Sequence, residues 1–427
     1  MNASSRAAGA VPEPVPLGCP ALYERGFDAA AGRLAAPGGP ALRPVTLNGG
    51  LRAWAATEPA LARGILTDPR LTNDIAEVGT PVQGFPDRRY PEDFFAHAPQ
   101  LLSASGERHR RLRRIVAPYF SAAAVASMAA RLRCGTARII EDLADRDRID
   151  IVTDFALPLA GAAVGEILDI PADRRLPAVT AALAASAVDP AAEDAGAAHR
   201  AFSRTVLNVI GVARRSTAAT PATALLRAQR AGEISSAELA GMIGMLLIGT
   251  VDSLTTVVPA GTLMAVRRPD VRHGLSHDTG PTTALTEEIL RLNPPFQHTG
   301  WRFTREPCRI ADVPLPHGAV VVTSLLAVNL DPGLWPDPLR ADPHRAAPGS
   351  HLSFGHGPHY CLGAALGRQL VHSALTGLFG RLPGLGLADT AGELTWHGTC
   401  LRRLDSLPAD PGGGHRMPPG RVPHSSK

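Results

Sequence analysis

Apolar residues recur at three- and four-residue spacing along most of the chain, the pattern of helices with one buried face. The clearest case is 362–379, where Leu362, Leu366, Leu375 and Phe379 share a face. The same spacing predicts helices over 107–131, 134–145, 235–267 and 282–293. Extended segments are few and short, and the pattern places them at 42–47, 302–303, 309–310 and 319–323. These elements predict a mainly α protein with a small β part.

The segment 235–267 is the longest apolar stretch. Ser235 and Glu238 form a capping box at its start, since the hydroxyl and the carboxylate can close the first backbone donors. Asp252 in the middle makes a lipid-facing helix unfavourable. We therefore expect a helix through the core of a globular domain, bent near Pro259, where one intrahelical hydrogen bond is lost.

Composition narrows the class of protein. The chain has 427 residues, of which 45% are hydrophobic, and 43 basic against 39 acidic residues give a net charge of +4. No run of like charge predicts nucleic-acid binding, and the first residues lack the pattern of a secretory signal or membrane anchor. We expect a cytoplasmic monomer with one domain over 16–408, a disordered segment at 1–15 and a disordered tail at 409–427.

The five cysteines point to a site that uses a single thiol. Cys19, Cys134, Cys308, Cys361 and Cys400 are odd in number, widely spaced and without a C-x-x-C pair, which argues against disulfides and structural zinc. Only Cys361 lies in an unusual setting, the loop FGHGPHYCLG at 354–363. Two other interpretations are a buried structural cysteine and a zinc cluster, the latter formed with His351, His356 and His359.

The loop has the features that a thiolate ligand of a flat cofactor requires. Gly355 permits a tight turn and close backbone approach, and Phe354 offers a ring face. Cys361 precedes a predicted helix that begins near Leu362, where free N–H groups and the helix dipole favour a negative sulfur. Iron in haem is held by one such protein thiolate in some proteins.

FGHGPHYCLG resembles the haem-binding loop of the cytochrome P-450 family, F-G-x-G-x-[HR]-x-C-x-G. The matching residues are Phe354, Gly355, Gly357, His359, Cys361 and Gly363. The resemblance covers roughly residues 100–405. It implies the single-domain fold of that family, helices around a buried haem b, and Cys361 as the iron ligand.

Other segments resemble the same family in the expected order. In TEEILRLNPP, Glu288 and Arg291 match its buried E-x-x-R pair, which Arg345 of ADPHR would join. His109 and Arg113 of GERHRRLRRIV match its H-x-x-x-R helix and would contact the haem propionates.

Two further segments extend this resemblance. Arg302 takes the place of an arginine that meets a propionate in the family, and Asn329-Leu330-Asp331-Pro332 replaces its N-R-D-P. Arginines 110, 111 and 114 point elsewhere; they are solvated or belong to a basic docking surface for an acidic electron donor.

The oxygen-activation motif A-G-x-[DE]-T-[TS] is altered here to Gly249-Thr250-Val251-Asp252-Ser253-Leu254. The resemblance implies that Asp252 and a hydroxyl of Ser253 or Thr250 relay protons to bound dioxygen, while Gly249 permits local widening of the helix. In the alternative interpretation, Thr250 only narrows the pocket and Ser253 bonds to its own helix.

The resemblance implies a haem-thiolate monooxygenase that activates dioxygen to hydroxylate or oxidatively couple a small specialised metabolite. Electrons would come from NAD(P)H through ferredoxin and ferredoxin reductase, because no reductase domain is present. A peroxide-dependent enzyme and a non-catalytic accessory homologue are the alternatives.

The substrate would lie above the ring, among residues 73–101, 245–253, 296–299 and 396–402. Gln297, His298, Thr299 and Thr399 make this region polar, which favours a peptide-like or polyketide-like substrate with amide or hydroxyl groups.

Overall fold

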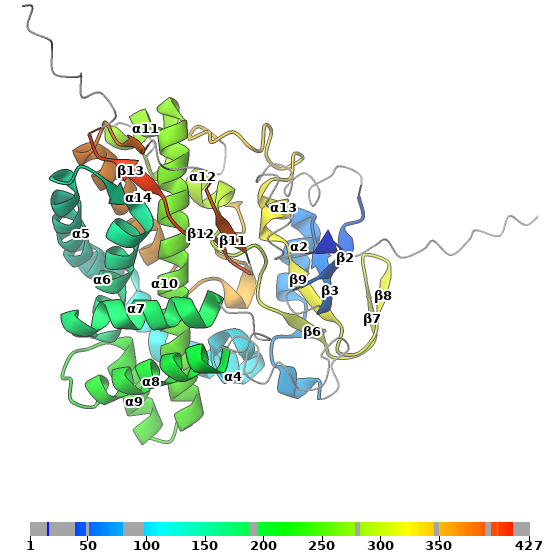
Figure 1. Cartoon of the computed structure of the whole chain (residues 1–427). Helices are drawn as coiled ribbons and strands as arrows, with labels where there is room; N and C mark the ends of the chain where they lie inside the picture. Colours follow the sequence, from blue (N-terminus) through cyan, green and yellow to red (C-terminus); the bar gives the residue numbers. More distant parts are fainter. Residues whose placement is uncertain are drawn as a thin grey trace, which may run out of the picture.

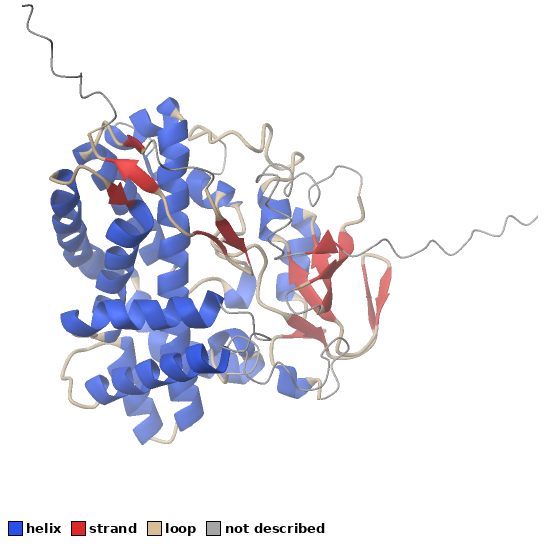
Figure 2. Cartoon of the chain, viewed as in Figure 1, coloured by secondary structure: helices blue, strands red, loops and turns tan. Residues whose placement is uncertain are grey.

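The computed structural model describes residues 15–16, 39–47, 51–79, 98–187, 195–277, 282–345, 350–388, 394–398 and 400–412. Helices make up the larger part, and a strand-rich part lies on the opposite side of the molecule (Figures 1 and 2). This agrees with the mainly α protein with a small β part that the hydrophobic pattern predicts.

The α-helices are α2 (Pro59–Thr67), α4 (Gly106–Val116), α5 (Ala122–Ala144), α6 (Leu157–Leu168), α7 (Ala172–Ala187), α8 (Ala195–Ala213), α9 (Pro221–Arg230), α10 (Ser236–Arg267), α11 (Pro269–Ser276), α12 (Thr282–Leu292), α13 (Leu325–Asn329) and α14 (Ala364–Arg381). Short 3-10 helices are η3 (Ile75–Glu77), η4 (Leu101–Ser103), η5 (Ala117–Phe120) and η8 (Gly357–His359), and a π-helix, η6, spans Ile151–Ala156.

The strands are β1 (Val15–Pro16), β2 (Leu42–Thr46), β3 (Arg52–Ala56), β4 (Leu71–Thr72), β5 (Ile149–Asp150), β6 (Arg302–Thr304), β7 (Cys308–Ile310), β8 (Val313–Leu315), β9 (Val320–Thr323), β10 (Gly386–Leu387), β11 (Trp396–Gly398), β12 (Arg402–Leu404) and β13 (Pro408–Asp410). The main sheet has the order β1-β2-β3-β9-β6-β4, and β10-β13-β5, β11-β12 and β7-β8 form smaller sheets. Strand β13 lies across the domain boundary expected at 408.

The helix expected over 107–131 is divided in two. Helix α4 ends at Val116, η5 contains Pro118, and α5 starts after Ser121, whose side chain accepts a hydrogen bond from the Ala124 N–H. The two helical segments meet at an angle of 54°. Proline cannot donate the backbone hydrogen bond that a continuous helix needs, and serine is a favoured N-cap. Helix α5 then runs unbroken through the gap expected at 132–133.

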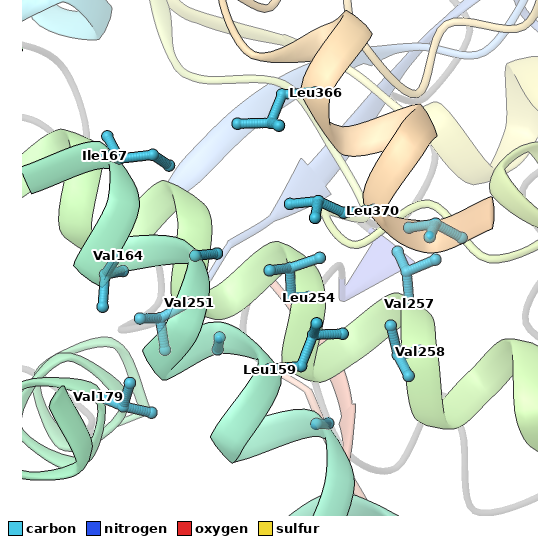
Figure 3. Packing of buried hydrophobic residues seen from close by; sticks show 14 of the residues in the cluster. Leu159, Val164, Ile167, Val179, Val251, Leu254, Val257, Val258, Leu366 and Leu370 are labelled. Carbon is cyan, nitrogen blue, oxygen red and sulfur yellow. The ribbon is translucent and has the colours of Figure 1, made fainter. Parts of the chain in front are cut away.

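Helix α10 passes through the helical part of the molecule (Figure 1). It begins with the predicted capping box and continues as helix across Pro259. Leu254, Val257 and Val258 of α10 pack among apolar side chains from α6, α7 and α14 (Figure 3). Two helical stretches, Ile151–Leu168 and Ser236–Arg267, have the length and composition of membrane spans, but most of each is buried inside the fold. These helical stretches are therefore surrounded mainly by other parts of the protein.

The buried Glu288–Arg291–Arg345 cluster is confirmed. Glu288 and Arg291 on α12 are fully buried, and Arg291 Nε lies 2.8 Å from Glu288 Oε1. Arg345 Nε lies 2.9 Å from Glu288 Oε2. Arg291 also donates to the carbonyls of Asn329, Pro338 and Arg340. The cluster thus fixes α12 against the segment that leads into the cysteine loop.

Candidate active site

A cavity of about 450 Å³ lies between the middle of α10 and the loop that carries Cys361. Gly249, Thr250 and Ser253 of α10 line it on one side, and Phe354 and Cys361 line it on the other. Leu246, Gly249, Thr250, Ser253 and Val257 form one stripe of the helix, since they are three or four residues apart. Sequence segments more than 100 residues apart therefore meet at one site.

The cysteine loop folds through glycines with positive φ. Gly355 has φ +73° and Gly357 has φ +70°, a backbone conformation that other residues rarely adopt. A Cβ at Gly357 would lie 2.6 Å from Thr67 Cγ2, so the loop also packs too tightly against α2 for a side chain here. The Cys361 N–H donates to the Phe354 carbonyl at 2.8 Å and closes the loop.

The Cys361 side chain is open to the cavity although it lies deep in the protein. Burial raises the pKa of its thiol, while the Gly363 N–H and the positive charges of Arg113 and Arg368 act in the opposite direction. Helix α14 begins at Ala364, two residues later than expected, so the Gly363 N–H is the backbone donor that contacts this sulfur. The sulfur therefore stays a neutral thiol unless a cation such as a metal ion binds it and displaces the proton.

Four basic side chains gather at one edge of the cavity: His109, Arg113, Arg302 and His359. The His109 and His359 rings lie 4.2 Å apart, and burial lowers the pKa of His109 to about 4 and that of His359 to about 3. Burial also lowers the pKa of Arg302 to about 10. At neutral pH the positive charge here is therefore carried by Arg113 and Arg302, and the burial of Arg302 has a free-energy cost.

No carboxylate among the described residues pairs with Arg113 or Arg302. Arg302 donates to Asn73 Oδ1 at 2.7 Å, and Arg113 donates to the Tyr360 carbonyl at 2.9 Å. The Arg302 Nε and His109 Nε2 atoms are buried without a hydrogen-bond partner. Such groups fit a bound molecule that carries carboxylates. Together with the open thiol and the glycine turn, they fit a haem with its two propionates.

Of the predicted proton-relay residues on α10, Thr250 and Ser253 line the cavity and Asp252 does not. The Thr250 hydroxyl, however, donates back to the Leu246 carbonyl at 2.8 Å. The back-bonding considered for Ser253 thus occurs at Thr250. A Cβ at Gly249 would meet no atom within 4 Å, and the helix stays regular there.

Asp252 is fully buried and is not part of the cavity wall. It follows Val251 and precedes Ser253 on α10, so its side chain leaves the helix about 100° away from that of Ser253. Its Oδ1 accepts a hydrogen bond from Ser186 Oγ of α7 at 2.8 Å, and its Oδ2 has no partner. Burial raises the pKa of Asp252 to about 7, against smaller opposing effects of Ser186 and Arg403.

Replacing Asp252 by asparagine is expected to change how stability depends on pH. The pKa of Asp252 is about 7 in the folded protein and near 4 in an unfolded chain. Between these pH values the folded state binds the proton and the unfolded state does not, so the free energy of unfolding falls as pH rises. The variant should gain stability over the parent across this window, by on the order of 4 kcal/mol in total. Urea unfolding from pH 4 to 8 measures it, with the exposed Asp142→Asn as control. If the difference in free energy of unfolding between Asp252→Asn and the parent changes with pH as little as it does for the control, the raised pKa of Asp252 is wrong.

Of the four residues expected around the substrate, His298 and Thr299 line the cavity. Gln297 is buried and does not line it, although Phe296 and His298 on either side do. Its side-chain amide donates to the Leu401 carbonyl at 3.2 Å. Thr399 lies outside the described residues.

Two polar residues of the wall come from helices that no motif identifies. Ser186 lies near the end of α7, and His199 lies near the start of α8. The His199 Nδ1 is buried without a partner. Their only sequence signal is a hydroxyl or imidazole three or four residues from a buried apolar residue of the same helix, Ala182 for Ser186 and Phe202 for His199. In the described part of the chain no group of three or more His, Cys, Asp or Glu side chains can hold a metal, which argues against the zinc cluster.

Comparison with known proteins agrees with this geometry. A family model described as Cytochrome P450 matches residues 281–382. Cytochrome P450 107B1 of Saccharopolyspora erythraea is 31% identical over 383 residues, which cover 87% of this chain and 92% of the relative. The 6-deoxyerythronolide B hydroxylase of the same organism is 31% identical over 366 residues, covering 84% and 90%.

The solved structures give the same result. The tirandamycin C-bound P450 monooxygenase TamI superposes with a TM-score of 0.82 and 29% identity, covering 93% of this chain and 100% of TamI. The sequence comparison, the fold and the arrangement of the thiol and basic residues thus all agree with the same protein family. The chain belongs to the cytochrome P450 family and is an oxidoreductase of its monooxygenase class.

Proposed function

We propose that the protein binds haem b through Cys361 and oxidises a small specialised metabolite of polyketide-like character, with electrons from NAD(P)H delivered by ferredoxin and its reductase. The observation that carries the proposal is one cavity with an open thiol at its floor and an uncompensated basic cluster at its edge. A haem bound there by a thiolate supplies dioxygen activation.

The residues of the lower part of the cavity bind and orient the ring. Cys361 gives the iron its protein ligand, and the Gly363 N–H holds the sulfur. His109, Arg113 and Arg302 take the propionates, which fixes the rotation of the ring in the cavity. Gly355 and Gly357 keep the loop backbone in the turn that leaves room beneath it.

The upper part of the cavity sets the substrate class. Leu246, Leu254 and Phe296 give an apolar wall, and His199, His298 and Thr299 add polar groups. Nδ1 of His298 is hydrogen-bonded to the Thr299 carbonyl at 2.8 Å, and burial lowers the pKa of this imidazole, so the ring meets the substrate neutral. An apolar skeleton with several hydroxyl or carbonyl groups suits such a wall.

The names of two relatives support this substrate class. One is a 6-deoxyerythronolide B hydroxylase, and the TamI structure contains tirandamycin C. On the α10 side, Ser253 lines the cavity and no described protein group hydrogen-bonds to its hydroxyl, so this hydroxyl could donate to a molecule held in the cavity. Thr250, which is bonded to Leu246, narrows the space.

Turnover of a panel of polyketide-like metabolites, with 6-deoxyerythronolide B and tirandamycin C among them, tests the proposal. We expect an oxidised product with ferredoxin, ferredoxin reductase and NADPH, preceded by a substrate-induced change in the haem spectrum. Product that forms with hydrogen peroxide but never with the redox partners would favour the peroxide-dependent alternative. Haem binding without product from either system would favour the accessory role.

A further inference from the structure

The Asp252 carboxyl group has no direct contact with the cavity. It is fully buried, and residues 249, 250, 253 and 254 line the cavity while residue 252 does not. Helix α6 sets apolar side chains against this part of α10, among them Leu159 and Val164 (Figure 3). A proton on Asp252 therefore needs another polar group to reach the cavity.

Ser186 is that group in this structure. It lies on α7, which packs against α10. Its hydroxyl donates to Asp252 Oδ1 at 2.8 Å and also lies 3.2 Å from the Leu183 carbonyl of its own helix, and the residue lines the cavity. A serine hydroxyl has one proton and two acceptor positions, so it can pass a proton on while it receives another. No other described side chain hydrogen-bonds to the Asp252 carboxyl group.

A charged residue from a third element, Arg403, also acts on Asp252. Strand β12 packs against α10, and the positive charge of Arg403 acts on the Asp252 carboxyl. Arg403 is half-buried, and its buried Nη1 has no hydrogen-bond partner, like Asp252 Oδ2. Each of these unpartnered polar atoms can take an ordered water as its hydrogen-bond partner. The remaining titratable group that the adjacent helices bring to this wall is His199 of α8.

We propose that Ser186 positions Asp252 and connects it to the cavity, and that Arg403 holds the water through which Asp252 is reprotonated; this rests on the proposed oxygenase function. When Asp252 is protonated, the Ser186 hydroxyl proton turns from the carboxyl group towards the cavity, and Ser186 Oγ accepts the hydrogen bond instead. In each transfer, the Asp252 carboxylic acid then gives its proton to Ser186 Oγ as the hydroxyl proton passes to an acceptor in the cavity. The carboxylate then takes a proton from solvent, so one proton moves from solvent to the cavity in total. The pKa of Asp252 near 7 suits such an exchange at neutral pH.

The first test measures the Asp252 carboxyl itself and needs no turnover. Infrared difference spectra against Asp252→Asn, recorded over pH, give the pKa of this group in the protein as isolated. Ser186→Ala should raise it, because a hydrogen bond to the ionised form is lost. Ser186→Thr keeps a hydroxyl and should return the pKa of the Asp252 carboxyl group to the parent value. Thr180→Ala is the matched control, since that hydroxyl is on the exposed side of the same helix and bonds to Leu176.

The second test measures coupling with redox partners and any substrate that turns over. Ser186→Ala should lower product formed per NADPH by about tenfold, with more hydrogen peroxide released and substrate affinity retained. Arg403→Gln should also lower the product formed per NADPH, whereas Ser186→Thr and Thr180→Ala should give the parent value. If Ser186→Ala keeps both the parent carboxyl pKa and the parent coupling, this inference is wrong while the oxygenase function stands. If the parent protein binds no haem, the oxygenase function itself fails, and the carboxyl titration still reports on the Ser186 contact.

Discussion

Replacing Glu288 by glutamine is expected to give a protein that unfolds far below the parent temperature and is recovered largely without haem. Burial opposes ionisation of Glu288, but the hydrogen bonds from Arg291, the Asp342 N–H and Arg345 outweigh it and hold its pKa below the usual range. Without that charge, Arg291 remains fully buried with no counter-ion. Breaking one side of a buried pair costs about 3–5 kcal/mol, a large part of the stability of a typical domain.

The chain contains a matched control for this change. Glu107 and Arg110 on α4 form an ion pair with the same i,i+3 spacing, but both side chains are about 70% exposed. Glu107→Gln should change the free energy of unfolding by less than about 1 kcal/mol. Thermal unfolding and haem absorbance of both variants measure the difference. Equal effects at the two positions would contradict the role of the buried cluster in fixing the cysteine loop.

Replacing Arg302 by methionine is expected to have opposite effects on the haem-free and haem-bound protein. The guanidinium is buried without a counter-charge, and its pKa of about 10 corresponds to roughly 3 kcal/mol of unfavourable burial. Loss of the hydrogen bond to Asn73 offsets about 1 kcal/mol of that. The haem-free variant should therefore be more stable than the haem-free parent by about 2 kcal/mol.

Haem should bind this variant at least about tenfold more weakly, because a charge-assisted hydrogen bond to a propionate is lost. Urea unfolding of the haem-free proteins and haem titration followed by absorbance measure the two effects. Arg305→Met is the control, since Arg305 is 40% exposed and pairs with Glu77 instead. If haem affinity at Arg302→Met equals that of the control, Arg302 is not a propionate ligand.

Much of the site can be predicted from the sequence because its chemistry is local. The ten residues from Phe354 to Gly363 hold the thiol, the turn glycines and two histidines, and their order alone restricts what the loop can bind. Glu288 and Arg291 are one helical turn apart, so their proximity follows from the helix. Arg345 joins them in the structure, as the resemblance to the family implies.

The contacts that sequence reasoning missed depend on packing between distant elements. Ser186 meets Asp252 only because α7 lies across α10, and nothing in the local pattern of either helix indicates this. Gln297, predicted to contact the substrate, instead donates its side-chain amide to the carbonyl of Leu401, 104 positions later in the chain. The break between α4 and α5 did have a local signal in Pro118 and Ser121, which the long apolar periodicity obscured.

The central claim, that Cys361 is the thiolate ligand of a haem, is tested most directly by one spectrum. The parent protein, reduced under carbon monoxide, should show the red-shifted Soret band of thiolate-ligated haem, and Cys361→Ala should lose it. Cys400→Ala, which changes a second cysteine of the same cavity, should keep it. A band that persists in Cys361→Ala, or a parent protein that never takes up haem, would contradict the account.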